Sequence, residues 1–242
     1  MKKTIIALMA LAGVACADTI NPLTEGTWTT GSRLSRPTWV LADGSLTLTN
    51  SNWSQAYAIY DLDTNLTGAW KFTSDIYRYN SSAGFTITLV GLDKALAIGT
   101  KDYGSGTAYW GTTTNVTAKG YSFQDALGDI SGTQVTTSTE AAEGVFNYNQ
   151  TAKIAASTAL DADSNVILTL SIDGTAVATP YTTTINMGKN FTLDKISVWG
   201  DGANNASNWS VTGMTISSIP EPTTATLSLL ALAGLAARRR RK

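Results

Sequence analysis

The side chains that most enzymes use for acid–base and nucleophilic chemistry are scarce in this chain. Its 242 residues include no histidine and one cysteine, Cys16. Without histidine, Ser-His-Asp and Cys-His catalysis and most zinc enzymes are excluded. Glycoside hydrolysis needs two carboxylates across the scissile bond. Glu25, Glu140 and Glu143 are the only glutamates before Glu221. Glu140 and Glu143 lie close together in a segment that resembles a loop. We therefore expect no enzymatic activity and name no catalytic residue.

Two aspartate-rich segments carry the oxygen ligands that calcium prefers. Asp61–Asn65 and Asp161–Asn165 both begin like an ion-binding loop. Both lack the glycine at position six and the glutamate at position twelve of an EF-hand, so ordinary turns are the favoured interpretation. Asp201–Asn205 contains further side-chain oxygens that could bind calcium in an arrangement other than an EF-hand. We expect no cofactor and no metal ligand, with calcium as the alternative.

The aromatic side chains are the remaining functional signal. Seven tryptophans and nine tyrosines in a chain with only 14% charged residues suit stacking on sugar rings, with Asn and Asp binding the hydroxyl groups. Trp70 and Trp199 fall in phase with strand cores, so we expect both to be buried packing residues. For every other aromatic residue, core or rim packing is the alternative. The tentative ligand surface consists of Trp53, Tyr57, Tyr109, Trp110, Asp201, Asn204, Asn205, Asn208 and Trp209.

Apolar and polar residues alternate along much of the chain, which predicts strands with one buried face. In residues 84–91, Phe85, Ile87 and Leu89 share one side, and two threonines share the other. The same period recurs in 45–49, 69–79, 166–172, 191–199 and 209–217. It slips in the last two segments, at Asp194-Lys195 and at Gly213, which predicts bulges or sharp bends there.

Asp-Gly pairs mark expected turns at 43–44, 173–174 and 201–202. The second pair predicts a tight hairpin, with a positive φ in the turn and a second strand over 175–179. Thr151–Leu160 is ambiguous, and Asp125–Gly128 is long enough for one helical turn. Outside the two ends, no long segment has a convincing helical period.

Many short strands with one apolar face each must pair two sheets face to face. The predicted fold class is all-β: an antiparallel two-sheet β-sandwich in a single domain over 18–217, with a helix at each end of the chain. The last third, 167–216, resembles the closing half of concanavalin A-like, laminin-G-like jelly rolls, in its order of strand, Asp-Gly hairpin, strand, strand ending in Gly-Asp-Gly, and final strand. The resemblance implies a jelly roll with a concave face and loops that often bind glycans, although fold alone confers no function.

The N-terminus has the three parts of a secretory signal peptide. Two lysines begin it, an apolar stretch follows at 5–14, and Ala15 and Ala17 supply small residues before Asp18. Cys16 allows a lipoprotein alternative, which the glycine three residues earlier disfavours. Cleavage by signal peptidase would remove the only cysteine, so the mature protein would have neither thiols nor disulfides.

Between its two ends the chain is acidic. Residues 18–219 contain 17 acidic and 10 basic residues, a net charge of −7, whereas the whole chain has a net charge of −1. No basic patch with interleaved aromatic residues occurs. We therefore do not expect nucleic acid as a partner.

The C-terminus combines a rigid tripeptide, an apolar run and a cluster of cations. Pro220-Glu221-Pro222 opens it, and residues 222–237 form a run of 16 residues without charge. As a helix this run would be about 24 Å long, a marginal span for a bilayer core of about 30 Å. The terminal cations, which should stay cytoplasmic, are Arg238, Arg239, Arg240, Arg241 and Lys242.

This order of parts resembles the PEP-CTERM sorting signal of Gram-negative bacteria. The resemblance covers 220–242 and implies recognition by an exosortase, an integral-membrane cysteine transpeptidase that cuts near Pro-Glu-Pro. It implies a transient membrane anchor and then delivery to the cell surface or extracellular matrix. The residues that it marks as the sorting motif are Pro220, Glu221, Pro222 and Arg238–Arg241.

Three function classes remain open. The first is an exported surface or matrix protein, processed by signal peptidase and an exosortase-type enzyme, that binds glycans or exopolysaccharide, or adheres, without catalysis. The second is a structural component of the surface matrix, and the third is a divergent glycoside hydrolase. The export signals, the jelly-roll pattern and the missing acid–base residues favour them in that order. The predicted domains are a signal peptide at 1–17, a β-sandwich at 18–217 and a sorting signal at 218–242.

Overall fold

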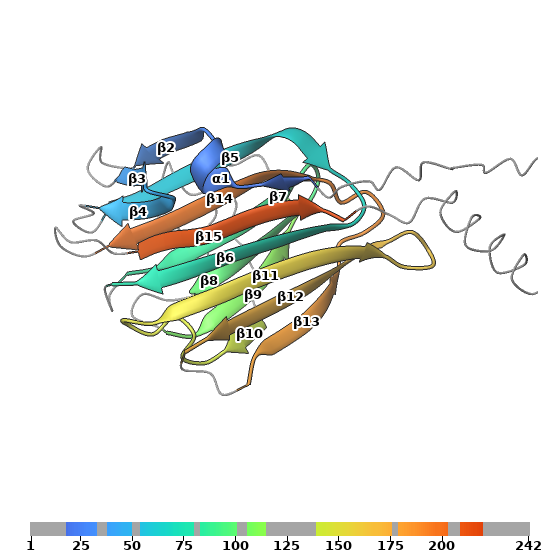
Figure 1. Cartoon of the computed structure of the whole chain (residues 1–242). Helices are drawn as coiled ribbons and strands as arrows, with labels where there is room; N and C mark the ends of the chain where they lie inside the picture. Colours follow the sequence, from blue (N-terminus) through green and yellow to red (C-terminus); the bar gives the residue numbers. More distant parts are fainter. Residues whose placement is uncertain are drawn as a thin grey trace, which may run out of the picture.

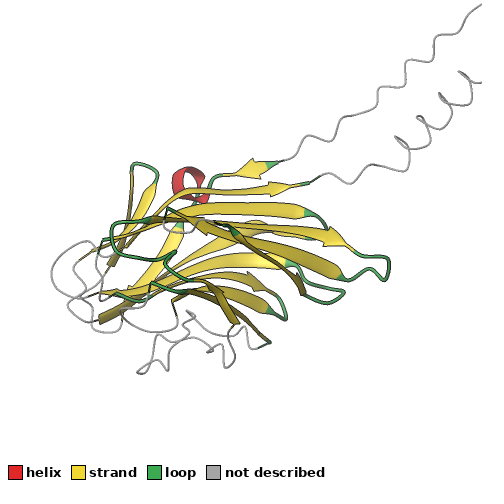
Figure 2. Cartoon of the chain, turned by 90° about the horizontal axis from the view of Figure 1, so that it is seen from below, coloured by secondary structure: helices red, strands yellow, loops and turns green. Residues whose placement is uncertain are grey.

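The structure is a computed structural model that describes residues 18–32, 38–49, 54–79, 83–100, 106–114, 139–175, 179–202 and 209–219. These residues form strands, apart from the four-residue helix α1 (Pro22–Glu25) and the connecting turns (Figure 2). Within them, no helix has the length and apolar character needed to cross a membrane. The predicted helices at the two ends, and the predicted turn at Asp125–Gly128, lie outside the described residues.

Two antiparallel sheets stack face to face (Figure 1). The eight-stranded sheet runs in the order β13 (Tyr181–Asn186), β12 (Val166–Gly174), β11 (Thr151–Leu160), β6 (Trp70–Arg78), β15 (Trp209–Ser218), β4 (Ser45–Thr49) and β3 (Thr38–Ala42), with β1 (Thr19–Ile20) paired to β15. The seven-stranded sheet runs in the order β10 (Thr139–Ala142), β9 (Ala108–Thr113), β8 (Ala95–Thr100), β7 (Phe85–Gly91), β14 (Leu193–Gly202), β5 (Ser54–Leu66) and β2 (Trp28–Ser32). The predicted all-β, antiparallel two-sheet sandwich is therefore confirmed.

The core lies between the sheets and is built by the period-two alternation of the strands. On β6, Trp70, Phe72 and Ile76 are buried in one cluster with Phe85 and Ile87 of β7. Each fully buried large side chain of this kind stabilises the fold by roughly 1.5–3 kcal/mol. A continuous apolar layer between two sheets is what lets a domain without disulfides fold.

The two predicted irregularities are present. The pairing of β14 with both β5 and β7 shifts register between Leu193 and Lys195. The pairing of β15 with β6 shifts between Thr212 and Thr215, and Gly213 at that point has φ of 58°. An extra residue in one strand explains both slips in the apolar period. The ambiguous segment Thr151–Leu160 is a strand, β11, held between β12 and β6.

The turn predictions hold at one Asp-Gly pair and fail at the other two. Asp43 and Gly44 both have positive φ (49° and 69°) and close the β3–β4 hairpin, as a type I′ turn requires. Gly174 instead continues β12 and pairs with Ala152. The predicted tight turn at Asp173-Gly174 is therefore wrong, because pairing with β11 extends β12 through both residues. Positions 176–178 of the predicted second strand lie outside the described residues, and the next described strand begins at Tyr181.

The last Asp-Gly pair lies in a strand and is no turn. Asp201 and Gly202 pair with Gln55 and Ser54 of β5. The Asp201 carboxylate accepts a hydrogen bond from the backbone N–H of Gly84, across the sheet, and does not cap a turn of its own. Neighbouring strands on both sides of β14 therefore outweigh the local turn preference of Asp-Gly.

The first and last described segments meet at one corner of the sandwich. Thr19 pairs with Ser217, and Ile20 pairs with Ile216. The backbone N–H of Ser218 donates to the carbonyl of Asp18 (3.1 Å), and the backbone N–H of Asp18 donates to the hydroxyl of Ser218 (3.2 Å). The two ends of the folded region are thus side by side.

Candidate functional site

The outer face of the seven-stranded sheet, which points away from the core, carries two of the predicted ligand residues, Tyr57 and Tyr109, and a cluster of buried polar residues. On β7, Phe85, Ile87 and Leu89 belong to the core cluster, so the alternating Thr86 and Thr88 point outward. On β14, Ile196 and Val198 belong to the core, and the alternating Ser197 and Trp199 do not. In register, Trp199 pairs with Thr86 and Ser197 with Thr88, so these four side chains are immediate neighbours on one face.

These four residues, here called the hydroxyl–indole cluster, are buried without hydrogen-bond partners. Thr86 and Thr88 have no exposed surface, Trp199 is 1% exposed and Ser197 is 2% exposed. Their polar atoms (Oγ1 of both threonines, Oγ of Ser197 and Nε1 of Trp199) meet no hydrogen-bond partner in the described part of the chain. A buried polar atom without a partner costs about 1–3 kcal/mol. Because at most 2% of each residue is exposed, other parts of the chain cover these four side chains, and the cluster is not open to a ligand in this structure.

The cluster lies in a row of outward residues that crosses the strands. The row is continuous in the register of the sheet and runs Tyr109, Gly99, Thr86, Trp199, Tyr57 and Gly31. Tyr109 packs against Ala97 of the neighbouring strand on the outer face. At the other end, a Cβ on Gly31 would stand 2.4 Å from both Cζ and Oη of Tyr57, so glycine is what lets this ring lie across strand β2. The half-buried rings of Tyr109 and Tyr57 thus lie near the two ends of the row.

Ionisable groups lie at the margins of this face. Lys195 and Asp61 extend the next rows on β14 and β5 and form an ion pair with each other (2.8 Å). Lys195 also contacts Asp194 at 3.1 Å. Glu140 lies beside Tyr109 on the edge strand β10. The centre of the face, among the described residues, therefore offers hydroxyl, indole and small apolar groups but no charge.

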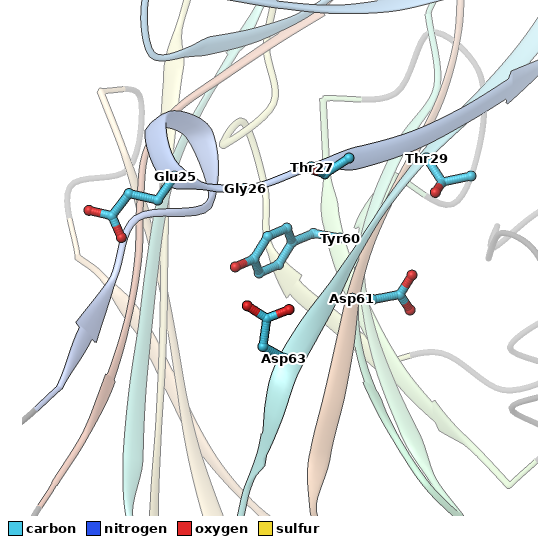
Figure 3. Close-up of a pocket in the computed structure, with 7 residues that line it drawn as sticks. All are labelled: Glu25, Gly26, Thr27, Thr29, Tyr60, Asp61 and Asp63. Carbon is cyan, nitrogen blue, oxygen red and sulfur yellow. The ribbon is translucent and has the colours of Figure 1, made fainter.

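An acidic hollow of about 260 Å³ lies at the edge of the same sheet, between α1, β2 and β5. It is lined by Glu25, Gly26, Thr27, Thr29, Tyr60, Asp61 and Asp63. Figure 3 shows that the three carboxylates point in different directions, with that of Asp63 turned toward Tyr60 and that of Asp61 away from it. Burial, and then the negative charges of Asp63 and Glu25, raise the pKa of the Tyr60 hydroxyl. Carboxylates that do not converge form no acid–base pair for glycoside cleavage.

A buried ionic cluster closes one end of the sandwich. Asp201 is 6% exposed, and burial raises the pKa of its carboxyl to about 7 against the opposing effects of the Gly84 N–H and the Arg78 charge. Arg78 is 1% exposed, and burial lowers the pKa of its guanidinium to about 10. Its Nη1 donates to the carbonyl of Phe146 at 2.7 Å, and its Cζ lies 5.4 Å from the centre of the Trp209 ring. This cluster joins the two sheets, since Arg78 belongs to β6 and Asp201 to β14.

The structure separates the residues of the predicted ligand surface. Tyr57 and Tyr109 lie on the outer face, at the two ends of the row of residues that crosses the strands. Asp201 lies in the ionic cluster. Trp110 points to the core side, and its Nε1 donates to the hydroxyl of Tyr181 in the other sheet at 2.8 Å. Ranges outside the described residues contain the other predicted positions: Trp53, Asn204, Asn205, Asn208, Ala15, Ala17, Pro220, Glu221, Pro222 and Arg238–Arg241.

Trp209 is a core residue with no exposed surface. Its ring centre lies 4.8 Å from that of Phe85 and 6.1 Å from that of Phe146. It therefore offers no surface to a ligand, and the pairing of β15 with β4 and β6 explains why it faces inward. Trp70 is buried in the core as predicted, whereas Trp199 is buried on the opposite face of its sheet.

The sequence did not predict that Thr86, Thr88 and Ser197 are buried. The alternation in 84–91 placed the threonines opposite the core, which would normally mean solvent. The structure covers that face, and no local sequence signal carries that information. The pairing of β7 with β14, which brings Ser197 beside Thr88, joins residues more than a hundred positions apart.

The described residues do not fit a calcium ion. No group of three or more acidic side chains among them is arranged to hold a metal. Asp161 uses its carboxylate to accept hydrogen bonds from the backbone N–H groups of Asp163 and Asn165 (2.9 and 2.8 Å) and from the amide of Asn165 (2.9 Å). These bonds hold the pKa of Asp161 below its usual value. Asp61, in the other candidate segment, is paired with Lys195.

Residues 218–242 match the PEP-CTERM protein-sorting motif, which confirms the resemblance seen at the C-terminus. No curated protein matches the chain in sequence.

Solved structures with the same architecture include carbohydrate-binding proteins and one enzyme. The exoplasmic/lumenal domain of VIP36, in its Ca²⁺/Man3GlcNAc-bound form, is 13% identical, with a TM-score of 0.51 over 85% of this chain and 87% of that one. A Bauhinia forficata lectin in complex with GalNAc is 12% identical, with a TM-score of 0.48 over 84% and 98%. A PL-14 alginate lyase from Aplysia kurodai is 10% identical, with a TM-score of 0.48 over 76% and 88%. The chain thus carries a PEP-CTERM sorting motif, which indicates an exported protein with a C-terminal anchoring signal, on a lectin-like two-sheet β-sandwich.

Proposed function

We propose that this protein is an exported, non-catalytic glycan-binding protein of the cell surface or extracellular matrix. The observation that carries the proposal is the pair of half-buried tyrosines on the outer face of the seven-stranded sheet, Tyr57 and Tyr109. Their rings are flat apolar surfaces of the kind on which sugar rings stack. The likeness of the fold to the VIP36 domain in its Man3GlcNAc-bound form also supports it.

The proposal includes no catalysis. The carboxylates in the acidic hollow do not converge, and Asp61 is held by Lys195. Asp201 accepts a hydrogen bond from Gly84 and is buried in the ionic cluster. These arrangements tie up side chains that an acid–base mechanism would need to be free. A divergent hydrolase therefore stays the weakest candidate.

A glycan array tests the binding function. The full-length chain is applied with and without calcium, and the Tyr57→Ala variant serves as the comparison because it removes one of the two half-buried rings. We expect selective signals for some polysaccharides, no dependence on calcium, and weaker signals for Tyr57→Ala. Silence across diverse polysaccharides would count against glycan binding. Concentration-dependent self-association in the same samples would then favour a structural component of the matrix.

The processing route is the second part of the proposal. Signal peptidase cuts before Asp18, the C-terminal helix holds the protein briefly in the inner membrane, and an exosortase-type transpeptidase cuts near Pro220-Glu221-Pro222. The two junctions would lie at the same corner of the sandwich, since Asp18 and Ser218 are hydrogen-bonded in both directions. Both cuts would then release the protein from the same place at the membrane surface.

The mass of the protein recovered from its source cell tests the processing route. We expect a mature chain that begins at Asp18 and lacks Arg238–Lys242. Replacing Pro220 and Pro222 with alanine should retain the C-terminal helix and keep the protein in the membrane fraction. A mature wild-type chain that still carries Arg238–Lys242 would refute the second cut.

A further inference from the structure

Four turns and the end of β15 lie at one end of the sandwich, here called the anchor end. Leu193, the first residue of β14, pairs with Leu66 at the end of β5 and with Gly91 at the end of β7. The backbone N–H of Ile219, just after β15, donates to the carbonyl of Ala69 in the β5–β6 turn (2.8 Å). The turns that connect β5 to β6, β7 to β8, β11 to β12 and β13 to β14 span residues 67–69, 92–94, 161–165 and 187–192.

The other two turns are joined to this end by hydrogen bonds. The hydroxyl of Thr158, near the end of β11, donates to the carbonyl of Gly68 (2.8 Å). The backbone N–H of Val166, at the start of β12, donates to the carbonyl of Gly188 in the β13–β14 turn (2.8 Å). Strands β5, β11 and β15 accordingly all end on the same side of the molecule, at the right in Figure 1.

Three aliphatic side chains at the anchor end are exposed. Leu92 is 59% exposed, Leu160 is 47% exposed and Ile219 is 44% exposed. Leu92 lies in the tight β7–β8 turn, a place that usually carries a polar residue or glycine. Leu160 is the last residue of β11, and Ile219 directly follows β15. Several large apolar side chains exposed on one end of a molecule are typical of a surface that meets an apolar partner.

The sequence that follows Ile219 identifies that partner. Only Pro220 and Glu221 separate Ile219 from the uncharged run 222–237 of the PEP-CTERM motif. Three residue steps reach at most about 11 Å. The headgroup region on one side of a bilayer is itself about 5–8 Å thick. When the run is inserted in a membrane, the anchor end therefore lies on the headgroups or within them.

The shortness of the run brings the anchor end still closer. As a helix the run is about 24 Å long, whereas the hydrocarbon core is about 30 Å thick. The cations Arg238–Arg241 hold its far end at the opposite surface. A span that is too short thins the bilayer or draws its flanking residues inward. On the side of the sandwich those residues are Pro220 and Glu221, which follow Ile219 directly.

The charges of the four turns nearly balance, so they form no basic patch. Asp93, Asp161 and Asp163 stand against Lys94 and Lys189. Attraction to anionic lipids requires clustered cations. The contact at this end is therefore made by the aliphatic side chains, and it should not depend on the charge of the lipids.

We infer that the anchor end docks on the membrane that holds the C-terminal run, with Leu92, Leu160 and Ile219 in the headgroup layer. The inference rests on the C-terminal anchor of the proposed processing route and does not depend on glycan binding. The bilayer covers the aliphatic side chains that water otherwise surrounds. Tyr148, in the turn before β11 at the opposite end of that strand from Leu160, then faces away from the membrane.

Fluorescence quenching in lipid vesicles tests the inference. The full-length chain with Cys16→Ser is reconstituted in phosphatidylcholine vesicles that contain a nitroxide on the lipid headgroup. A fluorophore is attached to Leu92→Cys, to Leu160→Cys or to the control Tyr148→Cys, which is 55% exposed and so matches Leu92 in accessibility. We expect the labels at 92 and 160 to lose most of their emission and the label at 148 to keep it. Added phosphatidylglycerol should change none of the three.

An acidic substitution shows whether the aliphatic side chains make the contact. Leu92→Asp places a carboxylate in the headgroup layer, where it loses hydration and meets lipid phosphates. We expect it to reduce the quenching of the label at 160, whereas Tyr148→Asp should leave that quenching unchanged. Both positions are exposed, so we expect both variants to fold.

Flotation of the vesicles separates this inference from the anchor on which it rests. A chain that does not float with the vesicles would overturn both. A chain that floats would overturn the docking alone in any of four cases: unquenched labels at 92 and 160, equal quenching at 148, quenching that requires phosphatidylglycerol, or full quenching at 160 in Leu92→Asp.

Discussion

The two sheets both direct threonine and serine side chains away from the core, but these side chains have different surroundings. On the outer face of the eight-stranded sheet, Thr73 and Thr215 are half-exposed, and their hydroxyls form a hydrogen bond of 2.7 Å. On the outer face of the seven-stranded sheet, Thr86 and Thr88 are fully buried and their hydroxyls have no partner. The first arrangement is a satisfied, solvated surface, and the second is a set of polar groups buried under other parts of the chain.

The comparison shows that residue type alone does not reveal which outward polar residues are buried. Threonine on an outward strand position usually faces water and satisfies its hydroxyl there. The same alternation produces both faces of this protein. What separates them is burial, which depends on the packing of segments remote in sequence.

A buried charge should produce the largest contrast between the two faces. Thr88→Lys places an ammonium where residue 88 has no exposed surface, and we expect a loss of several kcal/mol in unfolding free energy. Thr73→Lys places the same charge on a half-exposed position and should cost less than about 1 kcal/mol. Urea unfolding of both variants measures the difference. Equal tolerance of the two lysines would mean that the face around Thr88 is open to water.

The buried carboxyl of Asp201, on β14 of the seven-stranded sheet, should make the unfolding free energy depend on pH. Burial raises the pKa of this carboxyl from 3.8 to about 7, so the folded state holds the proton more tightly than the unfolded chain does. The contribution of Asp201 is therefore most favourable below about pH 4, falls as the pH rises toward 7, and is lost above that, with a total on the order of 4 kcal/mol. Urea unfolding of wild type and Asp201→Asn between pH 4 and 8 measures it. A wild-type slope retained in the variant would assign the effect to another group.

Removal of single hydroxyls should have opposite effects on the two faces. Thr88→Val should leave the unfolding free energy unchanged or raise it by up to about 1 kcal/mol, because it deletes a buried hydroxyl without a partner. Thr73→Val should lower it by about 0.5–1 kcal/mol, because it breaks the bond to Thr215. Thermal unfolding of the pair checks the sign. A clear destabilisation by Thr88→Val would show that its hydroxyl is hydrogen-bonded in solution.

The exposed ion pair at the margin of the binding face should have the smallest effect. Lys195 is 40% exposed and Asp61 is 61% exposed, so Lys195→Gln should change the unfolding free energy by less than about 1 kcal/mol. The small loss should shrink further in 1 M salt, because salt screens exposed charges. A salt-independent loss of several kcal/mol would instead give Lys195 a role in packing.

Much of the sandwich could be predicted from the sequence because strands have a strict period of two. The alternation in 84–91 and 166–172 predicts strands at the places where β7 and β12 occur. The slips at Asp194-Lys195 and Gly213 predict the two bulges, because an extra residue inverts the apolar phase. Asp173-Gly174 misled the prediction, since a local turn preference is weaker than the ladder of hydrogen bonds to β11.

The candidate site was predicted only in part. Tyr57 and Tyr109 were among the predicted ligand residues because aromatic side chains are recognisable without a structure. The burial of Thr86, Thr88 and Ser197 was not predicted. Trp199 is buried as predicted, but on the outer face of its sheet. Whether an outward strand residue is covered depends on segments remote in the sequence. Trp209 was assigned to the ligand surface and lies in the core, since its strand pairs in the middle of the eight-stranded sheet.

By itself the sequence determined the class of fold and the sorting motif, because alternation and a proline–apolar–cationic tail are encoded by residues close together in the chain. The tertiary structure decided which polar residues are isolated from water. Thr88 and Ser197 are 109 positions apart and become neighbours only when β7 pairs with β14. Burial without a partner is a property of such long-range pairings, and no stretch of sequence contains it.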